Sequence, residues 1–457
     1  MTTVQAERVN PVAADAALIA FRTGLYGSFT RWADALFELS DAVLCSPAPI
    51  SSVPALSLEP AFRRSHGSLY KALDQGVVDT DRVRDLLVAH RPADWPAVFA
   101  VDASSWPRCD AETSPERGFY YHPSRHSNGQ PIVAGWSYSW ISQLSWARDS
   151  WTAPLDARRI SPTQNSTDVT ASQVADLVGR LDANSPTPTF VFDAGYDPIA
   201  LTDALSTVRA NIVVRIRADR VFHTDPTAAA PGTIGRPRRH GTRFGLAESA
   251  DKQPEPDQEL TTTDPVYGKV HVRAWHDLHP KLGRRGHWAG HDNPPIVRGT
   301  VIRVQVEHLP KPTGRALKTL WLWAAGATPA DLDLAWRAYL RRFDIEHSFR
   351  FTKNTLGWTT PALRTPEQAD RWTWLTVASY TQLRLARSLV EDLRLPWERP
   401  RDAAKLTPAR VRRGFRRLRA IIDTPASPPK SQTPGPGRPK GTSRPPRTRY
   451  PAVKKTA

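Results

Sequence analysis

The chain has 457 residues, 40% of them hydrophobic and 23% charged, which is typical of a soluble globular protein with two or three domains. Lys and Arg total 62 against 45 Asp and Glu, so the net charge is +17 and favours a polyanionic partner, with nucleic acid preferred over a membrane surface. Cys45 and Cys109 are the only cysteines, which excludes a disulfide framework and a cysteine-based zinc site. With no secretory signal and no apolar run of about 18 residues, we expect a cytoplasmic protein without a membrane segment.

Most of the excess charge lies at the C-terminus. Residues 401–457 carry 16 Lys and Arg and two acids, a net charge of +14, and nine prolines follow Thr424. This composition predicts a basic, largely disordered tail that adheres to phosphate. Gly437-Arg438-Pro439-Lys440-Gly441 looks like the core of an AT-hook, so Arg438 and Lys440 are candidate DNA contacts in a minor groove. A solvated basic tail without groove contacts is the alternative.

The pattern of apolar residues divides the rest of the chain. Apolar positions recur at spacings of three and four, which predicts an N-terminal helical domain over residues 1–94. Strand-like runs at 98–107, 135–146, 190–197 and 211–222, with a helix at 170–183, predict a mixed α/β core over residues 95–222.

Residues 223–330 contain loop-like sequence with three strand candidates, at 267–278, 295–309 and 317–327. They predict either a β-rich insertion or a continuation of the core sheet. Helical patterns at 331–351 and 372–393 then predict C-terminal helices of the core within residues 331–400.

Two groups of residues in this region allow more than one interpretation. His276, His279, His287 and His291 are close in sequence, but without a cysteine and with Lys281 among them they favour loop histidines over a zinc site. Trp136, Trp140 and Trp146 share one strand region. We expect most tryptophans in the core and one or two stacked on unpaired bases.

Two acids follow apolar strands. Asp102 ends the run at 98–107, where an α/β sheet presents functional side chains, although a turn-forming Asp fits as well. Asp193 directly follows Phe190-Val191-Phe192 and must be paired, solvated or bound to metal. Asp197 is interpreted as the N-cap of the next helix.

The segment 336–353 is read as one helix with three faces. Tyr339, Arg342, Glu346 and Lys353 are spaced by three, four and seven and share a polar stripe. The expected apolar face holds Trp336, Leu340, Phe343 and Phe351, and the expected solvent side holds Arg337, Arg341, Asp344 and Ser348. A solvated charge stripe is the alternative explanation.

The spacing Y-x2-R-x3-E-x6-K resembles the signature of a large group of bacterial insertion-sequence transposases of the DDE type. The resemblance implies an α/β fold with an RNase-H-like mixed sheet, flanking helices and a β-rich insertion before the last catalytic helix. It also implies catalysis and metal binding by Asp102, Asp193 and Glu346, with two Mg²⁺ ions for which Mn²⁺ substitutes. The gaps are 193 − 102 = 91 and 346 − 193 = 153 residues, and the long second gap matches the insertion. After Asp193 the chain departs from some relatives, with Ala194 and Gly195 in place of an acid and an Arg.

These expectations describe an enzyme that cuts and rejoins DNA at the inverted-repeat ends of its own element. Tyr339, Arg342 and Lys353 would contact DNA phosphates. The resemblance and the chemistry of joining two ends favour double-stranded DNA as partner and a homodimer on DNA, with helix 372–393 as one candidate contact, in the bacterial nucleoid. An RNase-H-like nuclease that does not transpose, and a non-catalytic basic DNA-binding protein, are the alternatives.

Overall fold

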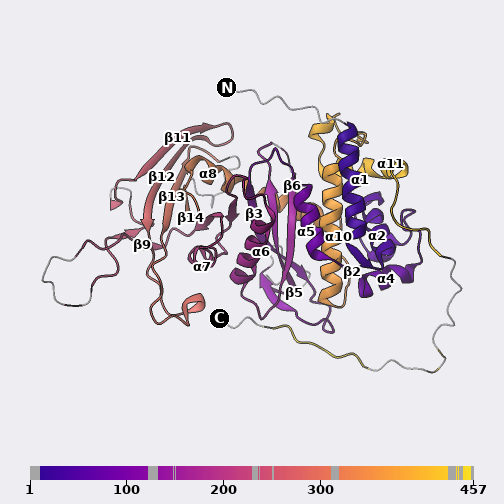
Figure 1. The fold of residues 1–457 in the computed structure, drawn as a ribbon, viewed down its shortest axis with the longest axis horizontal. Coiled ribbons are helices and arrows are strands. Elements are labelled where there is room, and N and C mark those ends of the chain that lie inside the picture. The colour runs from indigo at the N-terminus through magenta and orange to yellow at the C-terminus, as the bar shows by residue number, and fades with distance from the viewer. Residues whose placement is uncertain are drawn as a thin grey trace. The chain divides into compact units, whose positions relative to one another are not determined.

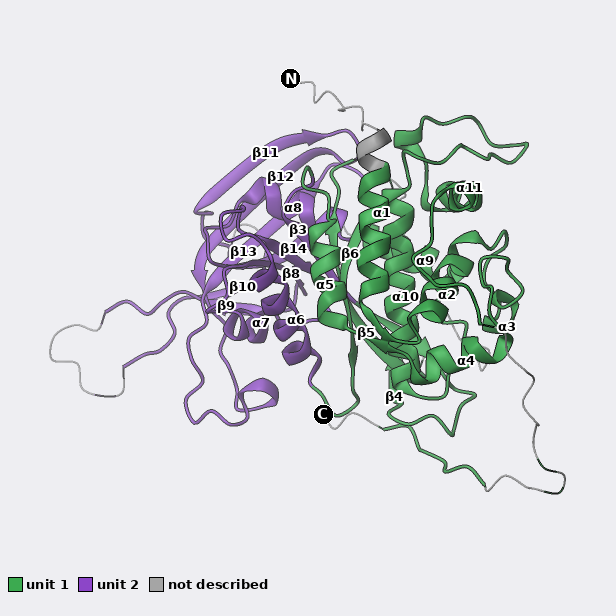
Figure 2. Cartoon of the chain, turned by 45° about the vertical axis from the view of Figure 1, so that its right-hand side comes forward, with its two compact units in different colours: residues 1–94, 103–164, 344–456 green, residues 95–102, 165–343, 457 purple. Residues whose placement is uncertain are grey.

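The computed structural model describes residues 11–121, 132–147, 149, 151–228, 235, 237–249, 252–309, 319–430, 439, 441 and 446–453. The chain forms two compact units, drawn in different colours in Figure 2. Unit 1 comprises residues 1–94, 103–164 and 344–456, and unit 2 comprises residues 95–102 and 165–343. Strand β3 (Val98–Pro107) passes from one unit to the other directly after Asp102. The N-terminal helices therefore share a unit with strands and helices from later in the chain.

Unit 1 is built on a long central helix, α10, which packs against α1, α2 and strand β6 (Figure 1). Its helices are α1 (Pro11–Gly27), α2 (Ala33–Cys45), α3 (Val53–Leu56), α4 (His66–Gln75), α5 (Thr80–Ala89), α9 (Asp344–Asn354), α10 (Pro366–Leu385), the 3₁₀ turn η3 (Ala403–Lys405) and α11 (Pro408–Ile421). Its strands are β1 (Phe29–Arg31), β2 (Val77–Val78), the second half of β3, β4 (Gly118–Tyr121), β5 (Ile132–Leu144) and β6 (Thr152–Ile160).

Burial of α10 corrects one expectation. Every side chain from Trp372 to Leu383 is buried within unit 1. This stretch of the 372–393 segment has no exposed face with which to contact a second copy. None of the helices in the described part of the chain is long and apolar enough to cross a membrane.

The core of unit 1 contains a cluster of aromatic rings. The rings of Trp106, Tyr138 and Trp140 each contact Trp358, and Trp106 also contacts Trp136 and Tyr138, with ring centroids 4.9–6.5 Å apart. These contacts are mainly edge-to-face, the arrangement that aromatic quadrupoles favour. Trp136 and Trp140 are therefore core residues, as expected for most tryptophans, whereas Trp146 is 41% exposed.

Unit 2 is a mixed sheet with helices, and its strand order is β11-β12-β13-β14-β8-β7-β3. The pairs β3·β7 and β7·β8 are parallel, and the pairs from β8 outward to β11 are antiparallel. Its elements are the first half of β3, α6 (Ser166–Arg180), β7 (Thr189–Phe192), α7 (Pro198–Ala204), β8 (Asn211–Ile216), β9 (Val221–His223), β10 (Arg243–Gly245), β11 (Gln258–Asp264), β12 (Gly268–Leu278), η2 (Gly286–Trp288), β13 (Gly299–Val306), β14 (Thr319–Gly326) and α8 (Leu332–Arg341). Because β14 pairs with β8, strands β11 to β14 continue the core sheet, whereas β10 pairs with β9 in a separate two-stranded sheet.

Side-chain caps fix where several helices begin. In each case a side-chain oxygen of the preceding residue accepts a backbone N–H of the first turn, which satisfies a donor that the helix leaves unpaired. The caps are Asp79 of α5, Asn165 of α6, Asp197 of α7, Asp331 of α8 and Thr365 of α10. The N-cap interpretation of Asp197 is thus confirmed.

The expectation of a largely disordered tail is wrong for residues 408–421. They form α11, whose Val411, Phe415 and Leu418 are buried in unit 1. The arginines of this helix are bound within the unit, as Arg410 pairs with Asp392 and Arg413 with Glu398. Their charge holds α11 in place, so it does not form the solvated basic surface that the composition suggested.

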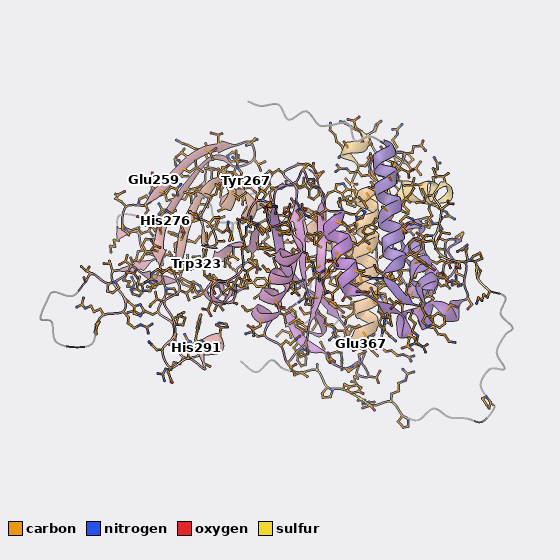
Figure 3. The ribbon with its side chains drawn as sticks, viewed as in Figure 1. Glu259, Tyr267, His276, His291, Trp323 and Glu367 are labelled. Atoms are coloured by element: carbon orange, nitrogen blue, oxygen red, sulfur yellow. The ribbon has the colours of Figure 1, made fainter. Side chains whose placement is uncertain are left out.

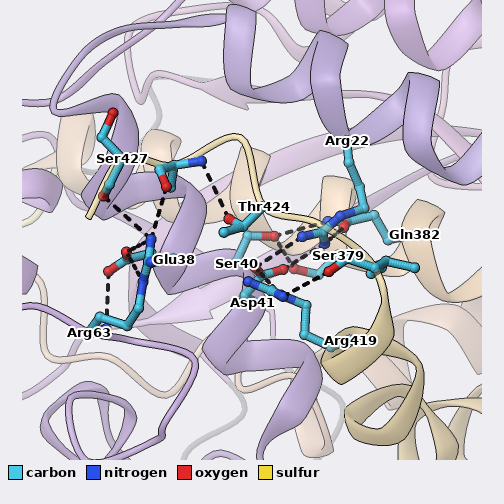
Figure 4. Close-up of polar contacts among 12 residues, drawn as sticks. Arg22, Glu38, Ser40, Asp41, Arg63, Ser379, Gln382, Arg419, Thr424 and Ser427 are labelled. Carbon is cyan, nitrogen blue, oxygen red and sulfur yellow. Dashed lines mark hydrogen bonds and ion pairs between the residues drawn. The ribbon is translucent and has the colours of Figure 1, made fainter. Parts of the chain in front are cut away.

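A buried ionic network ties α11 to the N-terminal helices (Figure 4). Asp41 of α2 accepts hydrogen bonds from Arg22 of α1 and Arg419 of α11, each at 2.6 Å. Arg22 also donates to Gln382 of α10 at 2.8 Å. Helices α1, α2 and α11 therefore meet at one carboxylate, and α10 joins the network through Arg22.

Candidate active site

Asp102 and Asp193 lie on neighbouring parallel strands of unit 2. The register pairs Val98 with Thr189 and Ala100 with Val191, an offset of 91 residues. Since 193 − 102 is also 91, the same register continued by two residues places Asp102 opposite Asp193, directly after β7 ends at Phe192. Neighbouring strands are about 4.8 Å apart, and both aspartates are half-buried. The two aspartates thus lie beside the carboxyl end of β7. The prediction that Asp102 ends its own strand is wrong, because β3 continues to Pro107.

Asp193 is oriented by its own turn. Its Oδ1 accepts the backbone N–H of Gly195 at 2.8 Å. A Cβ at position 195 would lie 3.0 Å from that oxygen, so glycine lets the turn fold back on the carboxylate. Asp197 points elsewhere, because its carboxylate accepts the N–H groups of Ile199 and Ala200 at the start of α7.

Arg342 forms an ion pair with the first of these aspartates. Its Nη1 donates to Oδ2 of Asp102 at 3.0 Å, and the two side chains are only 5% and 17% exposed. Its guanidinium also lies over the ring of Phe343, 4.8 Å from the centroid. The sequence placed Arg342 on a stripe open to DNA, whereas the structure buries it against the first aspartate.

The prediction of one continuous helix over 336–353 is wrong. α8 ends at Arg341 and α9 begins at Asp344, with Arg342 as the C-cap of α8. The break changes which side chains are exposed. Phe343, expected on the apolar face, is 42% exposed, and Ser348, expected at the solvent side, is 4% exposed. Ser348 bonds to Thr152 within unit 1, which explains its burial.

The four stripe residues consequently belong to different units. Tyr339 and Arg342 lie in unit 2 with both aspartates, and Tyr339 is buried at 2% exposure. Glu346 and Lys353 lie on α9 in unit 1. Glu346 is exposed in the first turn of α9, and Lys353 lies in its last turn with Nζ 5.6 Å from the centroid of the Trp358 ring.

The donor chemistry at the sheet edge fits a hard divalent cation. Mg²⁺ prefers carboxylate oxygen, and unit 2 supplies two carboxylates in register. Among the residues that the structure describes, no three His, Cys, Asp or Glu side chains already form a metal-binding group. Within unit 2, the aspartate pair is therefore the part of the predicted triad that the fold brings together.

Of the four histidines considered for zinc, His287 and His291 lie near each other, with ring centroids 6.5 Å apart, whereas His276 and His279 have other neighbours. His276 and His291 are labelled in Figure 3 and lie well apart, with His276 bonded to Thr300 at 3.0 Å. His287 contacts Asp203 at 3.3 Å. His279 instead contacts His223 and His240, two histidines that the sequence analysis did not single out. Their ring centroids lie 6.5 and 5.2 Å from that of His279.

These three histidines share an electrostatic property. Burial lowers the pKa of His223, His240 and His279 below the usual value of 6.5, and neighbouring cations such as Lys281 add to the effect for the first two. Nδ1 of His240 and Nε2 of His279 are 3.0 Å apart, which is a hydrogen bond between neutral rings. The cluster is a neutral imidazole contact between the β9–β10 hairpin and the end of β12.

A pocket of unit 2 does not contribute to the aspartate site. This pocket, of about 890 Å³, is lined by Thr189 and Asn211, so it lies at the amino ends of β7 and β8, opposite Asp193. Arg438 and Lys440, the candidate minor-groove contacts, lie outside the described residues.

The chain is similar to known proteins at two levels. A family model described as "DDE superfamily endonuclease" matches residues 24–280. A cryo-EM structure of the piggyBac transposase synaptic complex with hairpin DNA is similar with a TM-score of 0.44 and 10% identity, over 93% of this chain and 84% of that chain. That structural likeness is too distant to carry an argument. No curated protein sequence matches the chain. Because the family model spans more than half of the 457 residues, this protein belongs to the DDE superfamily endonucleases.

Proposed function

We propose that this endonuclease is a transposase that cuts and rejoins DNA at the inverted-repeat ends of an insertion sequence. The observation that carries the proposal is the in-register pair Asp102 and Asp193 at the carboxyl edge of the unit 2 sheet. In a chain of this superfamily, two such carboxylates are the natural holders of a catalytic cation. Glu346 is proposed as the third acid, on the strength of the Y-x2-R-x3-E-x6-K spacing and its exposure on α9.

The proposed core is RNase-H-like, and its acids would hold two Mg²⁺ ions, or Mn²⁺ in their place. When bound, such ions activate an oxygen nucleophile and stabilise the leaving oxygen of a phosphodiester. The protein's own contribution is to orient the carboxylates. The Gly195 amide orients Asp193, and the guanidinium of Arg342 donates a hydrogen bond to Oδ2 of Asp102.

DNA as the partner follows from charge and family together. The net charge of +17 attracts phosphate, and the superfamily is one of endonucleases. Joining two element ends requires both to be held at once, so we propose a homodimer on DNA in the bacterial nucleoid. Lys353 is proposed to contact the backbone of the bound DNA.

The test compares three Asp-to-Asn variants on DNA that carries the repeats flanking the gene. Asp102→Asn and Asp193→Asn should bind this DNA but cleave it orders of magnitude more slowly in Mg²⁺. Asp197→Asn is the matched control, because asparagine caps a helix as well as aspartate does and only the charge is lost. Equal cleavage by Asp193→Asn and Asp197→Asn would refute the site.

The products of the same assay separate transposition from simple cleavage. A transposase joins the cut ends to a supercoiled target plasmid, whereas a nuclease releases them. Cleavage without joining by the intact protein would support the non-transposing alternative.

A further inference from the structure

Arg342 has a different task from the one its place in the signature suggests. We infer that it is a positioning residue for Asp102 and makes no contact with DNA phosphate. The inference rests on the proposed function, because it gives Asp102 a metal to hold. The proposed role of Arg342 thereby changes from binding DNA phosphate to orienting a metal-binding carboxylate.

The burial of Arg342 is the first reason. A phosphate-binding guanidinium must present its N–H groups to solvent, where the DNA backbone runs. The Arg342 side chain is 5% exposed, and its Nη1 is engaged by Oδ2 of Asp102 at 3.0 Å. Moving it to a phosphate would leave the half-buried carboxylate of Asp102 without this partner.

The backbone of Arg342 is also fixed. It is the C-cap of α8, and its N–H lies 3.0 Å from the carbonyl of Ala338 and 3.2 Å from that of Tyr339. Its guanidinium rests on the Phe343 ring at 4.8 Å. A residue held at its backbone, and at its guanidinium by both a carboxylate and an aromatic ring, suits a group that orients another residue.

A charged donor on one carboxylate oxygen has a definite effect on metal binding. The hydrogen bond restricts rotation of the carboxylate, so the remaining ligand geometry is set before the cation arrives. Partners of this kind are worth roughly 10- to 100-fold in metal affinity. Arg342 should therefore influence metal affinity, although it carries the same charge as the metal.

Helix α8 also provides a matched control. Arg337 pairs with Asp333 at 2.9 Å and lies over Trp336 at 4.6 Å, so it repeats the carboxylate and ring contacts of Arg342 away from Asp102. Arg337→Gln removes the same chemistry from the same helix. A loss of metal affinity that is seen in Arg342→Gln but not in Arg337→Gln is then due to the lost contact between Arg342 and Asp102.

The experiment measures Mn²⁺ binding to the full-length protein by electron paramagnetic resonance, without DNA. Arg342→Gln should weaken Mn²⁺ binding roughly 10- to 100-fold, and Arg337→Gln should leave it unchanged. Arg342→Lys keeps the charge and one donor and should recover part of the loss. If Arg342→Gln does not fold, Arg342→Lys provides the test. Lysine lacks the planar fork of the guanidinium, so if Arg342 positions Asp102, this variant still binds Mn²⁺ several-fold more weakly than the unaltered protein.

A second measurement distinguishes positioning from phosphate contact. The salt dependence of DNA binding should be the same for Arg342→Gln and the unaltered protein, whereas a lost phosphate contact lowers the slope by about 0.9. Unchanged Mn²⁺ affinity in Arg342→Gln, with or without a lower slope, overturns the inference. Asp102→Asn tests the proposed function separately, because unchanged Mn²⁺ binding by that variant would remove the metal from Asp102.

Discussion

Arg342 and Asp102 are 240 positions apart in sequence, and their side chains form an ion pair of 3.0 Å in unit 2. Arg342 is the C-cap of α8, and Asp102 lies within β3. The pair links the end of α8 to the aspartates and gives Arg342 a role inside the protein.

The buried network around Asp41 predicts a large effect on stability. Asp41→Asn removes the charge that Arg22 and Arg419 share, at a position with 0% side-chain exposure. Uncompensated buried charges cost roughly 3–5 kcal/mol, so denaturant unfolding should show a loss of that size. Glu391→Gln breaks an exposed pair with Arg417 and should cost less than about 1 kcal/mol. Equal small losses would mean that the network is not a tie between α1, α2 and α11.

The C-terminus should separate into a folded part and a DNA-binding part. Truncation after Lys430 removes seven Lys and Arg but keeps α11 and the segment whose Ala426 and Ser427 carbonyls bind Arg63. The truncation also removes Tyr450, whose carbonyl accepts a hydrogen bond from the buried Arg117, so the variant should fold with a modest loss of stability. Its DNA binding should depend less on salt, by up to about 0.9 in slope per phosphate lost. Truncation after Leu406 removes α11 and should unfold unit 1. Fluorescence anisotropy at several salt concentrations measures the first effect and circular dichroism the second. An unchanged slope would show that the segment does not touch DNA.

The histidine cluster predicts loss of stability on acidification. The pKa values of His223, His240 and His279 are lowered in the folded protein, mainly by burial. The unfolded chain therefore takes up protons first, starting near pH 6.5, and the folded state loses stability as the pH falls below that value. Denaturant unfolding at pH 7.5 and 5.5 should show a smaller pH effect in His240→Gln. His271→Gln, an exposed histidine of the same unit, should keep the full effect; equal changes in both variants would contradict the assignment.

The sequence located one strand end correctly and one wrongly. Asp193 directly follows the end of β7, as an acid after three apolar strand residues indicates, whereas β3 continues past Asp102 to Pro107. The break between α8 and α9 contains no glycine or proline, so the sequence gives no local sign of it. A helical wheel continued across Arg342 and Phe343 therefore assigned Phe343 and Ser348 to the wrong environments. The break had to come from tertiary packing.

Long-range pairing explains the other differences. In α11 the high charge concealed an apolar face of Val411, Phe415 and Leu418, because the fold pairs its arginines with acids as distant as Asp41, the partner of Arg419. His223 and His279 are likewise brought together only by the pairing of their backbones, at an isolated bridge. Composition reports how many charges a segment has, but not which partners the fold supplies.

Glu346 gives the most direct prediction about catalysis. It is exposed in the first turn of α9, and the proposal makes it the third metal-binding acid. Glu346→Gln keeps the size of the side chain and removes its charge, so folding and DNA binding should persist while cleavage falls by orders of magnitude. The measurement is strand cleavage in Mg²⁺ on DNA carrying the flanking repeats.

The control for that variant must match its effect on the helix. Asp344 was expected on the solvent side but is half-buried, so it serves poorly. Glu367, labelled in Figure 3, is an exposed acid in the first turn of α10 and lies in the same unit as Glu346. Glutamine at either position loses a similar interaction with the helix dipole, about 0.3–1 kcal/mol, so the stability cost is the same for both. A general effect of charge or stability would make the two variants cleave alike, whereas a metal-binding Glu346 makes only its own variant inactive. If Glu346→Gln cleaves DNA at the same rate as Glu367→Gln, Glu346 is not part of the site. Of the three proposed acids, only Asp102 and Asp193 would then remain.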